Sequence, residues 1–277
     1  MVIAQAGWEA RLALTYTLRG ERTVLSGREH SGPLVVQKPL YPEGDAVCHS
    51  IVLHPPGGIA GGDSLALDVR LGEGSAALLT TPGAAKWYRS TGAAARVGQR
   101  FYIASGAVLE WLPQPAIVFD QARAEAKTEI VLEQDALYIG WDTTCMGRTA
   151  SGERFNSGEL RQRTAVWQQD RRLWCEYARL AGDDAMLASK AGLAGCTVSG
   201  TLTAAGKDIG KDLLDTCRSI APDGEGHSGI TVLPRVLLAR YLGHSSEAAM
   251  HYFTALWTLL RPALAGRAAV PPRIWST

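Results

Sequence analysis

Short stretches in which apolar and polar residues alternate run through the larger, N-terminal part of the chain. Over residues 8–19 every second residue is apolar, which predicts a strand with one buried face. Comparable stretches recur about every ten residues, a spacing typical of antiparallel sandwiches, barrels and β-solenoids. They span residues 65–71, 96–104, 107–112, 127–132, 136–143, 158–168 and 171–180. The pattern predicts a mainly β fold of many short strands, with Ser105-Gly106 as the turn of a hairpin between 96–104 and 107–112.

Two stretches near the C-terminus predict helices instead. Residues 207–219 carry apolar side chains along one stripe. Ser245 is a suitable cap for a stronger helix, which we expect to run to about Arg261 and to end before Pro262. Trp257 lies off the apolar stripe of this helix. Packing against the core is its favoured role, ahead of a contact with a partner.

The C-terminal tail, residues 267–277, is rich in proline and also carries basic and aromatic residues. Terminal tails are usually disordered. Ile274 and Trp275 lie so close to the end that docking explains them better than disorder does. We therefore expect the tail to dock, either on this fold or on a partner.

A dense cluster of glycine and proline lies between two of the predicted strands. It is His54-Pro55-Pro56-Gly57-Gly58-Ile59-Ala60-Gly61-Gly62-Asp63. Glycine adopts positive φ without a Cβ clash and proline fixes φ, so this segment predicts a compact, shaped loop. A phosphate-binding loop needs Lys-Ser or Lys-Thr after the glycines, and a dinucleotide-binding loop needs a helix there. Neither follows Asp63, so a tight multi-turn connection in a β fold is the favoured interpretation.

Composition and charge exclude several classes of function. The 277 residues are 46% apolar and have a formal net charge of +1, so no overall field attracts nucleic acid or an anionic membrane. No apolar run approaches the ~18 residues that a membrane helix needs. The five cysteines include no CxxC pair, which argues against a disulfide framework or a zinc knuckle. Residues 1–8 lack the basic region of a secretory signal, so we expect a cytoplasmic protein.

Motifs for common catalytic chemistry are missing, but two acidic residues occupy unusual positions. The sequence has no G-x-S-x-G elbow, no HExxH and no His-x-His pair. Asp142 and Glu176 fall inside otherwise apolar strand segments, where an acid is costly to bury unless it is paired or lines a wet cavity. One interpretation is a surface face or an arginine partner; the other is an acid-lined passage that could hold a hard or borderline cation. The arginines available for pairing are Arg148, Arg154, Arg161 and Arg179.

Several longer motifs in the chain resemble the successive signatures of one protein family. The first is the glycine-rich cluster at residues 54–63. The others are Thr80-Thr81-Pro82-Gly83-Ala84-Ala85-Lys86-Trp87-Tyr88-Arg89-Ser90, Leu109-Glu110-Trp111-Leu112-Pro113-Gln114, Gly147-Arg148 with Gly152-Glu153-Arg154-Phe155, and Pro272-Arg273-Ile274-Trp275-Ser276-Thr277. In this order they resemble urease accessory protein D, the UreD family, called UreH in some organisms. The resemblance covers nearly the whole chain and implies one UreD-type domain over residues 1–277, β-rich over 8–205 and with helices in 206–277.

The resemblance also implies a fold and a function. The fold of the family is an irregular β-helix-like stack of many short strands, with a few helices mostly toward the C-terminus. Its members are not enzymes. They act as chaperones that bind the urease apoprotein and, with accessory protein F and the GTPase G, enable nickel insertion into the urease active site. The implied cargo is transient Ni²⁺, with no tightly bound cofactor and neither nucleic acid nor membrane as a partner.

The family pattern further implies which residues serve this function. A conduit should bind metal weakly and repeatedly, since a tight site would trap the ion; scattered carboxylates suit that better than a His/Cys cage. The positions expected along the Ni²⁺ path are Asp63, Asp68, Asp142 and Glu176, with His54 as a weak ligand. The positions expected to form family motifs and interfaces are Gly57, Gly58, Gly61, Gly62, Lys86, Tyr88, Arg89, Arg148, Arg273 and Trp275.

Two other functions stay open on the sequence. The first is a purely structural scaffold that docks proteins F and G on urease while nickel passes elsewhere. The second is an enzyme on a β-solenoid, with Arg148 and Asp142 as the active pair in one pocket. Nothing in the sequence requires that second activity.

Overall fold

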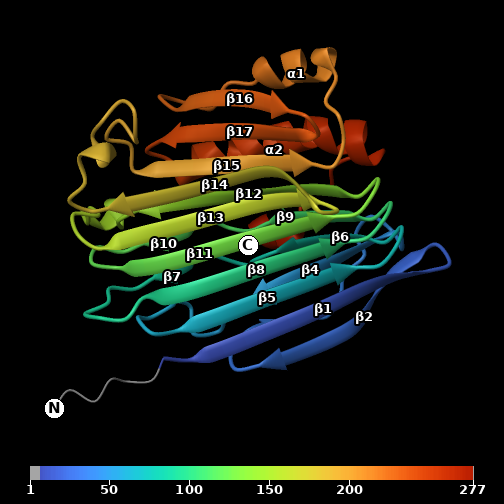
Figure 1. The fold of residues 1–277 in the computed structure, drawn as a ribbon, viewed down its shortest axis with the longest axis horizontal. Helices are drawn as coiled ribbons and strands as arrows, with labels where there is room; N and C mark the ends of the chain where they lie inside the picture. The colour runs from blue at the N-terminus through green and yellow to red at the C-terminus, as the bar shows by residue number, and fades with distance from the viewer. Residues whose placement is uncertain (1–6, 277) are drawn as a thin grey trace.

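The computed structural model describes residues 7–276 of the chain. Residues 1–6, part of the stretch considered above for a secretory signal, and Thr277 of the closing motif lie outside the described residues. Two β-sheets face each other, and the helices lie toward the C-terminal end of the chain (Figure 1). Among residues 7–276, no helix combines the length and the apolar composition that crossing a membrane would require.

Seven long strands form the first sheet. They are β1 (Glu9–Arg19), β2 (Arg22–Ser31), β5 (Ser64–Leu71), β8 (Ala95–Ile103), β11 (Arg123–Leu132), β13 (Glu159–Gln168) and β14 (Arg171–Ala181). Across the sheet their order is β14-β13-β11-β8-β5-β1-β2. The central strands β1, β5, β8, β11 and β13 are parallel, whereas the hairpins β1–β2 and β13–β14 at the two margins are antiparallel.

The second sheet has ten strands, most of them shorter. They are β3 (Val35–Val36), β4 (Val47–Leu53), β6 (Ala76–Thr80), β7 (Ala85–Trp87), β9 (Val108–Leu112), β10 (Ala116–Val118), β12 (Leu137–Met146), β15 (Val198–Ala205), β16 (His227–Leu233) and β17 (Val236–Gly243). Their order is β16-β17-β15-β12-β9-β6-β4-β3, and the short strand β10 joins β7 to β12 beside this path.

The chain crosses repeatedly from one sheet to the other. The strands β4, β6, β9 and β12 lie in the second sheet, and after each of them the chain crosses to a strand of the first, namely β5, β8, β11 and β13. The short strands β7 and β10 precede the crossings to β8 and β11. Each coil returns in the same direction, so neighbouring coils pair in parallel. The expectation of a β-helix-like stack of many short strands, with a few helices mostly toward the C-terminus, is therefore confirmed (Figure 1).

The hairpin expected at Ser105-Gly106 is wrong. The two strands exist, but β8 lies in the first sheet and β9 in the second. Gly106, with φ of +67°, turns the corner between the sheets. Alternation fixes which face of each strand is buried but carries no information on the pairing partner, and here both strands pair with the preceding and following coils.

Two α-helices, α1 (Lys211–Arg218) and α2 (Ser246–Ala265), accompany three short 3₁₀ helices in the described part of the chain. The 3₁₀ helices are η1 (Thr149–Ser151), η2 (Ala185–Leu187) and η3 (Arg273–Ser276). The expected cap of α2 is confirmed, since the hydroxyl of Ser245 accepts a hydrogen bond from the Ala248 amide at 3.1 Å. The expected end before Pro262 is wrong, because α2 continues to Ala265 and is capped by Gly266. Leu260 and Arg261 are fully buried beside the proline, and this packing offsets its cost of ~3 kcal/mol or more.

Helix α2 and the C-terminal tail pack on the second sheet. Trp257 is 0% exposed, which confirms its packing role. Its indole Nε1 donates a hydrogen bond to Glu110 at 2.6 Å. In the tail, Trp275 donates to the hydroxyl of Thr80 at 2.9 Å, and its ring lies 5.7 Å from that of Trp141. The tail therefore docks on this fold.

Candidate functional site

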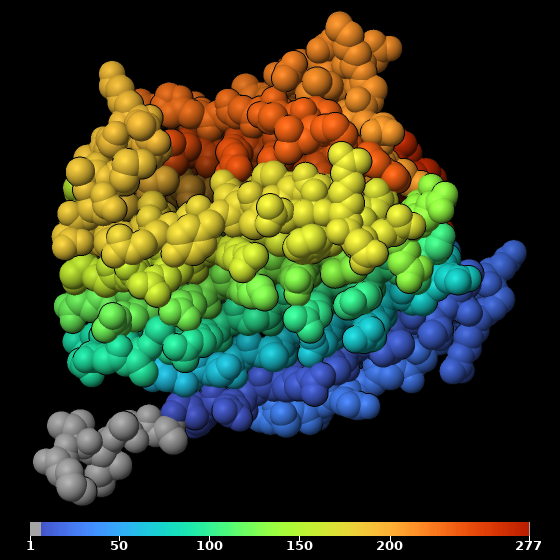
Figure 2. Space-filling view, in the orientation of Figure 1, coloured from blue at the N-terminus to red at the C-terminus, as the bar shows by residue number. Residues whose placement is uncertain are grey.

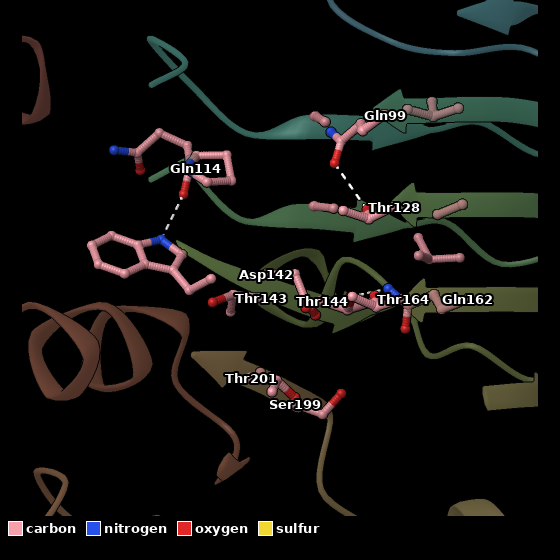
Figure 3. Close-up of a pocket in the computed structure, with 18 of the residues that line it drawn as sticks. Gln99, Gln114, Thr128, Asp142, Thr143, Thr144, Gln162, Thr164, Ser199 and Thr201 are labelled. Atoms are coloured by element: carbon pink, nitrogen blue, oxygen red, sulfur yellow. Dashed lines mark hydrogen bonds between the residues drawn. The ribbon is translucent and has the colours of Figure 1, made fainter. Parts of the chain in front are cut away.

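A cavity of about 720 Å³ lies between the two sheets. On one side it is bordered by β5, β8, β11, β13 and β14, and on the other mainly by β9, β12, β15, β16 and β17. Because it crosses these strands instead of following one of them, it extends along the direction in which the coils stack. Figure 3 shows polar side chains from several strands gathered around this space.

The lining of the cavity changes along its length. Near β4 and β5 it is apolar, with Val52, Leu65 and Leu67. Midway the side chains that face inward are polar but uncharged; they are Gln99, Thr128, Thr144, Gln162 and Thr164. At β12, β14 and β17 it becomes charged; the residues there are Asp142, Glu176 and Arg240. Figure 2 shows the outer surface stepping back from β14 to β17, on the side of the charged end.

Hydroxyl and amide groups in the middle of the cavity bond to one another and leave oxygens facing the space. Thr128 donates to the Gln99 side chain at 3.0 Å, and Gln162 donates to the Thr144 hydroxyl at 3.2 Å (Figure 3). Such groups can bind water or a hydrated cation weakly. They provide a polar lining without fixed charge.

Asp142 lies at a break in the pairing of β12. The first part of β12 pairs with β9 up to Gly140, and its last part pairs with β10 from Thr144 onward. Pro113 and Pro115 separate β9 from β10, and proline cannot donate a ladder hydrogen bond. The Asp142 side chain therefore projects into the cavity where the second sheet is locally open (Figure 3).

Glu176 has a cationic partner in the cavity, whereas Asp142 has none. Arg240 pairs with Glu176 at 2.8 Å and also donates to the Thr201 hydroxyl at 3.3 Å. Within residues 7–276, no protein group hydrogen-bonds the Asp142 carboxylate. None of the four arginines proposed from the sequence is the partner of Glu176, because β17 reaches the cavity only through the fold. Each of the two interpretations made from the sequence therefore describes one of the acids. Glu176 has an arginine partner, and Asp142 lines the cavity without one.

The environment of Asp142 disfavours its charged form. The Asp142 side chain is exposed to solvent, but it lies among the residues of β12, β14 and β17 that line the cavity. Burial, followed by the negative charge of Glu176, raises the pKa of Asp142 from 3.8 to about 7, against the opposing effect of Arg240. Near neutral pH this acid therefore exchanges readily between its protonated form and a form that can bind a cation.

This pKa predicts a pH-dependent stability. Asp142 binds its proton more tightly in the folded than in the unfolded chain, so its contribution to folding is lost as pH rises from about 4 to about 7. In Asp142→Asn this loss is absent. Thermal unfolding measured at about pH 5 and about pH 8 should show that the stability of the variant relative to the wild type is greater at the higher pH. Asp68→Asn, on the outer face, is the matched control, and an equal difference at both pH values would contradict the prediction.

Comparisons with known proteins agree with the geometry. A family model described as UreD urease accessory protein matches residues 9–276. The chain belongs to the UreD family. A urease accessory protein UreD from Azoarcus sp. (strain BH72) is 52% identical over 274 residues, covering 99% of this chain and 96% of that protein. The corresponding protein of Dechloromonas aromatica is 54% identical, covering 98% and 95%, and that of Pseudomonas aeruginosa PAO1 is 51% identical with the same coverage.

The resemblance to the UreD family also implied that Asp63 and Asp68 lie along the Ni²⁺ path. Neither of these two acids is among the residues that line the cavity. Asp63 accepts hydrogen bonds from the amides of Trp8 and Ala60, each at 2.8 Å, and so holds the glycine loop in place. Asp68 points to the outer face of the first sheet, where it pairs with Arg11 at 3.2 Å. The alternation of β5 accounts for this, because its apolar positions face inward.

His54 does border the cavity. Burial lowers the pKa of its imidazole, against the opposing charge of Asp63. The neutral ring is the form that can ligate a metal ion. The residues of the first two UreD motifs that also border the cavity include Gly57, Gly58 and Lys86.

The first two UreD motifs pack against each other, and this contact requires glycine. A Cβ on Gly58 would overlap the ring of Tyr88, and one on Gly61 would overlap the side chain of Ser90. Gly57 and Gly62 adopt positive φ, at 73° and 98°. The sequence-based interpretation of the cluster as a tight multi-turn connection agrees with this geometry.

Arg148 lies away from the cavity lining. It pairs with Glu153 at 2.6 Å and stacks over the ring of Phe119 at 4.4 Å. The pair of Arg148 and Asp142 considered for an enzyme is therefore not brought together. Arg89 and Arg273, also UreD motif residues, are exposed.

A buried ionic network beneath α2 was missed by the sequence analysis. Arg261 pairs with Glu110 at 2.9 Å and with Glu43 at 2.7 Å, and Glu43 also contacts His49 at 2.5 Å. Burial raises the pKa of Glu110, opposed by Arg261. Burial also acts to raise the pKa of Glu43, but hydrogen bonds from His49 and Arg261 outweigh burial and hold this pKa below its ordinary value. The sequence did contain one signal of this network. Glu110 is an acid inside an otherwise apolar UreD motif, just as Asp142 is an acid inside an otherwise apolar strand.

Among residues 7–276, no group of three or more His, Cys, Asp and Glu side chains is placed to hold a metal ion. Most donors in the cavity are dispersed oxygen atoms, and the described lining residues also include the imidazoles of His54 and His227. Their arrangement suits repeated weak contacts with a hydrated cation better than a single tight site.

Proposed function

We propose that this protein is a non-enzymatic urease maturation factor and that its cavity is a conduit for Ni²⁺ on the way to the urease apoprotein. The observation that carries the proposal is the unpaired Asp142 carboxylate at the charged end of a cavity with a polar middle. The names of the relatives, urease accessory protein UreD, support the role in urease maturation.

The chemistry of the cavity lining suits the passage of Ni²⁺ better than its storage. Ni²⁺ is a borderline cation that binds tightly to imidazole and thiolate groups, whereas dispersed carboxylates, hydroxyls and waters hold it weakly. Asp142 must lose its proton to bind the ion, and its pKa of about 7 makes that loss inexpensive at neutral pH. Arg240 shares the charged end, so its pairing with Glu176 keeps the total negative charge there low enough for release.

The proposed partners complete this role. From the family resemblance, we propose that accessory protein F bridges this protein to the GTPase G, which supplies nickel, and that the chain binds the urease apoprotein. In the alternative function, a scaffold, the same proteins assemble but nickel does not enter the cavity. The two functions differ in one testable respect, the need for an open cavity.

Filling the cavity tests this difference. Thr128→Trp places a large ring among the polar side chains of the middle section. In cells that express urease and the other accessory proteins and are supplied with nickel, this variant should reduce urease activation to a small part of the wild-type level. Activation is measured as urease activity and as nickel bound per urease active site.

The control is the same substitution on the outside of the protein, Thr17→Trp, on the outer face of β1. Both variants must retain binding to protein F and to urease in a pull-down. Full activation by the Thr128 variant would favour the scaffold. Loss of partner binding by that variant alone calls for a smaller plug, Thr128→Leu, judged by the same measurements.

A further inference from the structure

One row of residues crosses the outer face of the first sheet without a single carboxylate. Strand pairing places its members side by side from β1 to β14. They are Arg11, Ala66, Gly98, Lys127, Arg163 and Tyr177, here called the cation row. The row lies on the face of the sheet seen in Figure 2.

The side chains of the cation row point away from the cavity. Lys127 and Arg163 belong to strands that border the cavity and are among its lining residues, but alternation turns their side chains outward. On β11, Ala126 and Thr128 are partly buried and face the cavity, whereas Lys127 between them is exposed. On β13 the same holds for Arg163, which is exposed between Gln162 and Thr164. The row is therefore a separate surface from the proposed conduit.

In the two neighbouring rows each arginine has a carboxylate partner, which distinguishes these rows from the centre of the cation row. In one, Glu125 lies between Arg96 at 3.0 Å and Arg161 at 3.6 Å. In the other, Arg100 pairs with Glu129 at 3.1 Å. In the first of these rows Arg161 and Arg179 lie opposite each other, and both pair with Glu159, at 2.6 Å and 2.5 Å. The rule for a sheet is that opposite charges on adjacent strands stabilise it.

The cation row violates this rule at its centre. Lys127 and Arg163 are directly opposite each other on adjacent strands. Like charges in that position destabilise a sheet. In the part of the chain that the structure describes, neither side chain has an ion-pair partner. An anion from outside would relieve the repulsion.

The shape of the row also leaves room for such an anion. A Cβ added to Gly98 would meet nothing within 4 Å, so the space above it is open. At the end of the row Tyr177 is 62% exposed, an aromatic side chain offered to solvent. Small residues in the middle and an aromatic residue at one end form a shallow track beside the two cations.

We propose that the cation row binds an acidic, extended segment of a partner protein. The row crosses six strands, from β1 to β14, and at ~4.8 Å per strand interval it is ~24 Å long. An extended segment of about seven residues spans that length. Its carboxylates would pair with Lys127 and Arg163, and Tyr177 would contact its apolar part.

A protein segment fits this surface better than a nucleic acid does. In the flanking rows Glu125 and Glu129 neutralise the neighbouring arginines, so those rows add no continuous basic strip for a phosphate backbone. A peptide can instead place its carboxylates only where the cations are. The chain also has a net charge of only +1, without the basic excess typical of nucleic-acid binding.

The test uses the whole protein and a fluorescein-labelled peptide of about nine residues in which glutamate and serine alternate, which is about two residues longer than the row requires. Fluorescence anisotropy gives its dissociation constant. In the double variant Lys127→Glu with Arg163→Glu, binding should weaken about tenfold, since two attractions become two repulsions of exposed charges. A peptide with glutamine in place of glutamate should not bind.

The matched control is Lys38→Glu with Lys190→Glu, two exposed lysines outside the first sheet, which changes the net charge by the same amount. Equal weakening in both double variants would overturn the proposal, because it would reveal attraction by net charge alone. Absence of peptide binding by the wild type would overturn it as well, as would displacement of the peptide by duplex DNA at a lower concentration than by unlabelled peptide. Melting temperatures verify that both variants are folded.

Discussion

Replacing Arg261 by methionine is expected to lower the free energy of unfolding by about 3–5 kcal/mol, the cost of removing one partner from a buried ion pair. Arg261 is 1% exposed and Glu110 is 2% exposed, so neither water nor another cation can replace the lost contact. Without the guanidinium, Glu110 and Glu43 remain buried as two acids close together. Glu110 then keeps only the hydrogen bond from Trp257.

Urea unfolding of the whole protein measures this loss. The matched control is Arg11→Met, which removes an exposed pair with Asp68 and should cost at most about 1 kcal/mol. Adding Glu110→Gln to Arg261→Met should recover part of the stability, since it removes a buried charge that has lost its partner. A loss from Arg261→Met no larger than that from the control would contradict the network's structural role.

The combination of Asp142→Asn and Glu176→Gln is expected to reduce urease activation in nickel-supplied cells to the level of cells that lack this protein. The amides keep the shape of the carboxylates but cannot bind a cation as anions do. The change also leaves Arg240 without its anion, so the charged end of the cavity becomes net positive and repels Ni²⁺. Each single variant should lose less activity than the pair.

The control combines Asp68→Asn with Glu73→Gln, two acids that do not border the cavity. Pull-downs must show that every variant still binds protein F and urease. Activation at the wild-type level by the Asp142 and Glu176 double variant would exclude these acids from the nickel path and make the scaffold the better description. A loss shared by the control would point instead to a general effect of reduced negative charge.

The local pattern predicted many strands of this protein correctly, because long strands of the first sheet such as β1 and β5 bury one face and expose the other. The first predicted strand, residues 8–19, corresponds closely to β1, and the glycine-rich loop was correctly placed between β4 and β5. Asp142 and Glu176 were identified for the same reason, since an acid in an apolar strand interrupts the pattern. Both do border the cavity.

The errors at Ser105-Gly106 and at Pro262 share one physical origin, which is that contacts between residues far apart in the chain are not encoded in the local sequence. The turn at Ser105-Gly106 suits a hairpin as well as it suits a corner between sheets. Pro262 ends most helices, yet buried neighbours carry α2 past it.

The sequence by itself determined the strand content, the shaped glycine loop, the family motifs and the two acids of the cavity, because these depend on side-chain polarity and backbone freedom at neighbouring positions. Only the tertiary structure decided which sheet each strand joins, that Arg240 partners Glu176, that Arg261 joins Glu43 to Glu110, and that Lys127 faces Arg163. Those contacts join residues far apart in the chain. They exist only after the coils stack, because stacking sets the register that brings the residues together.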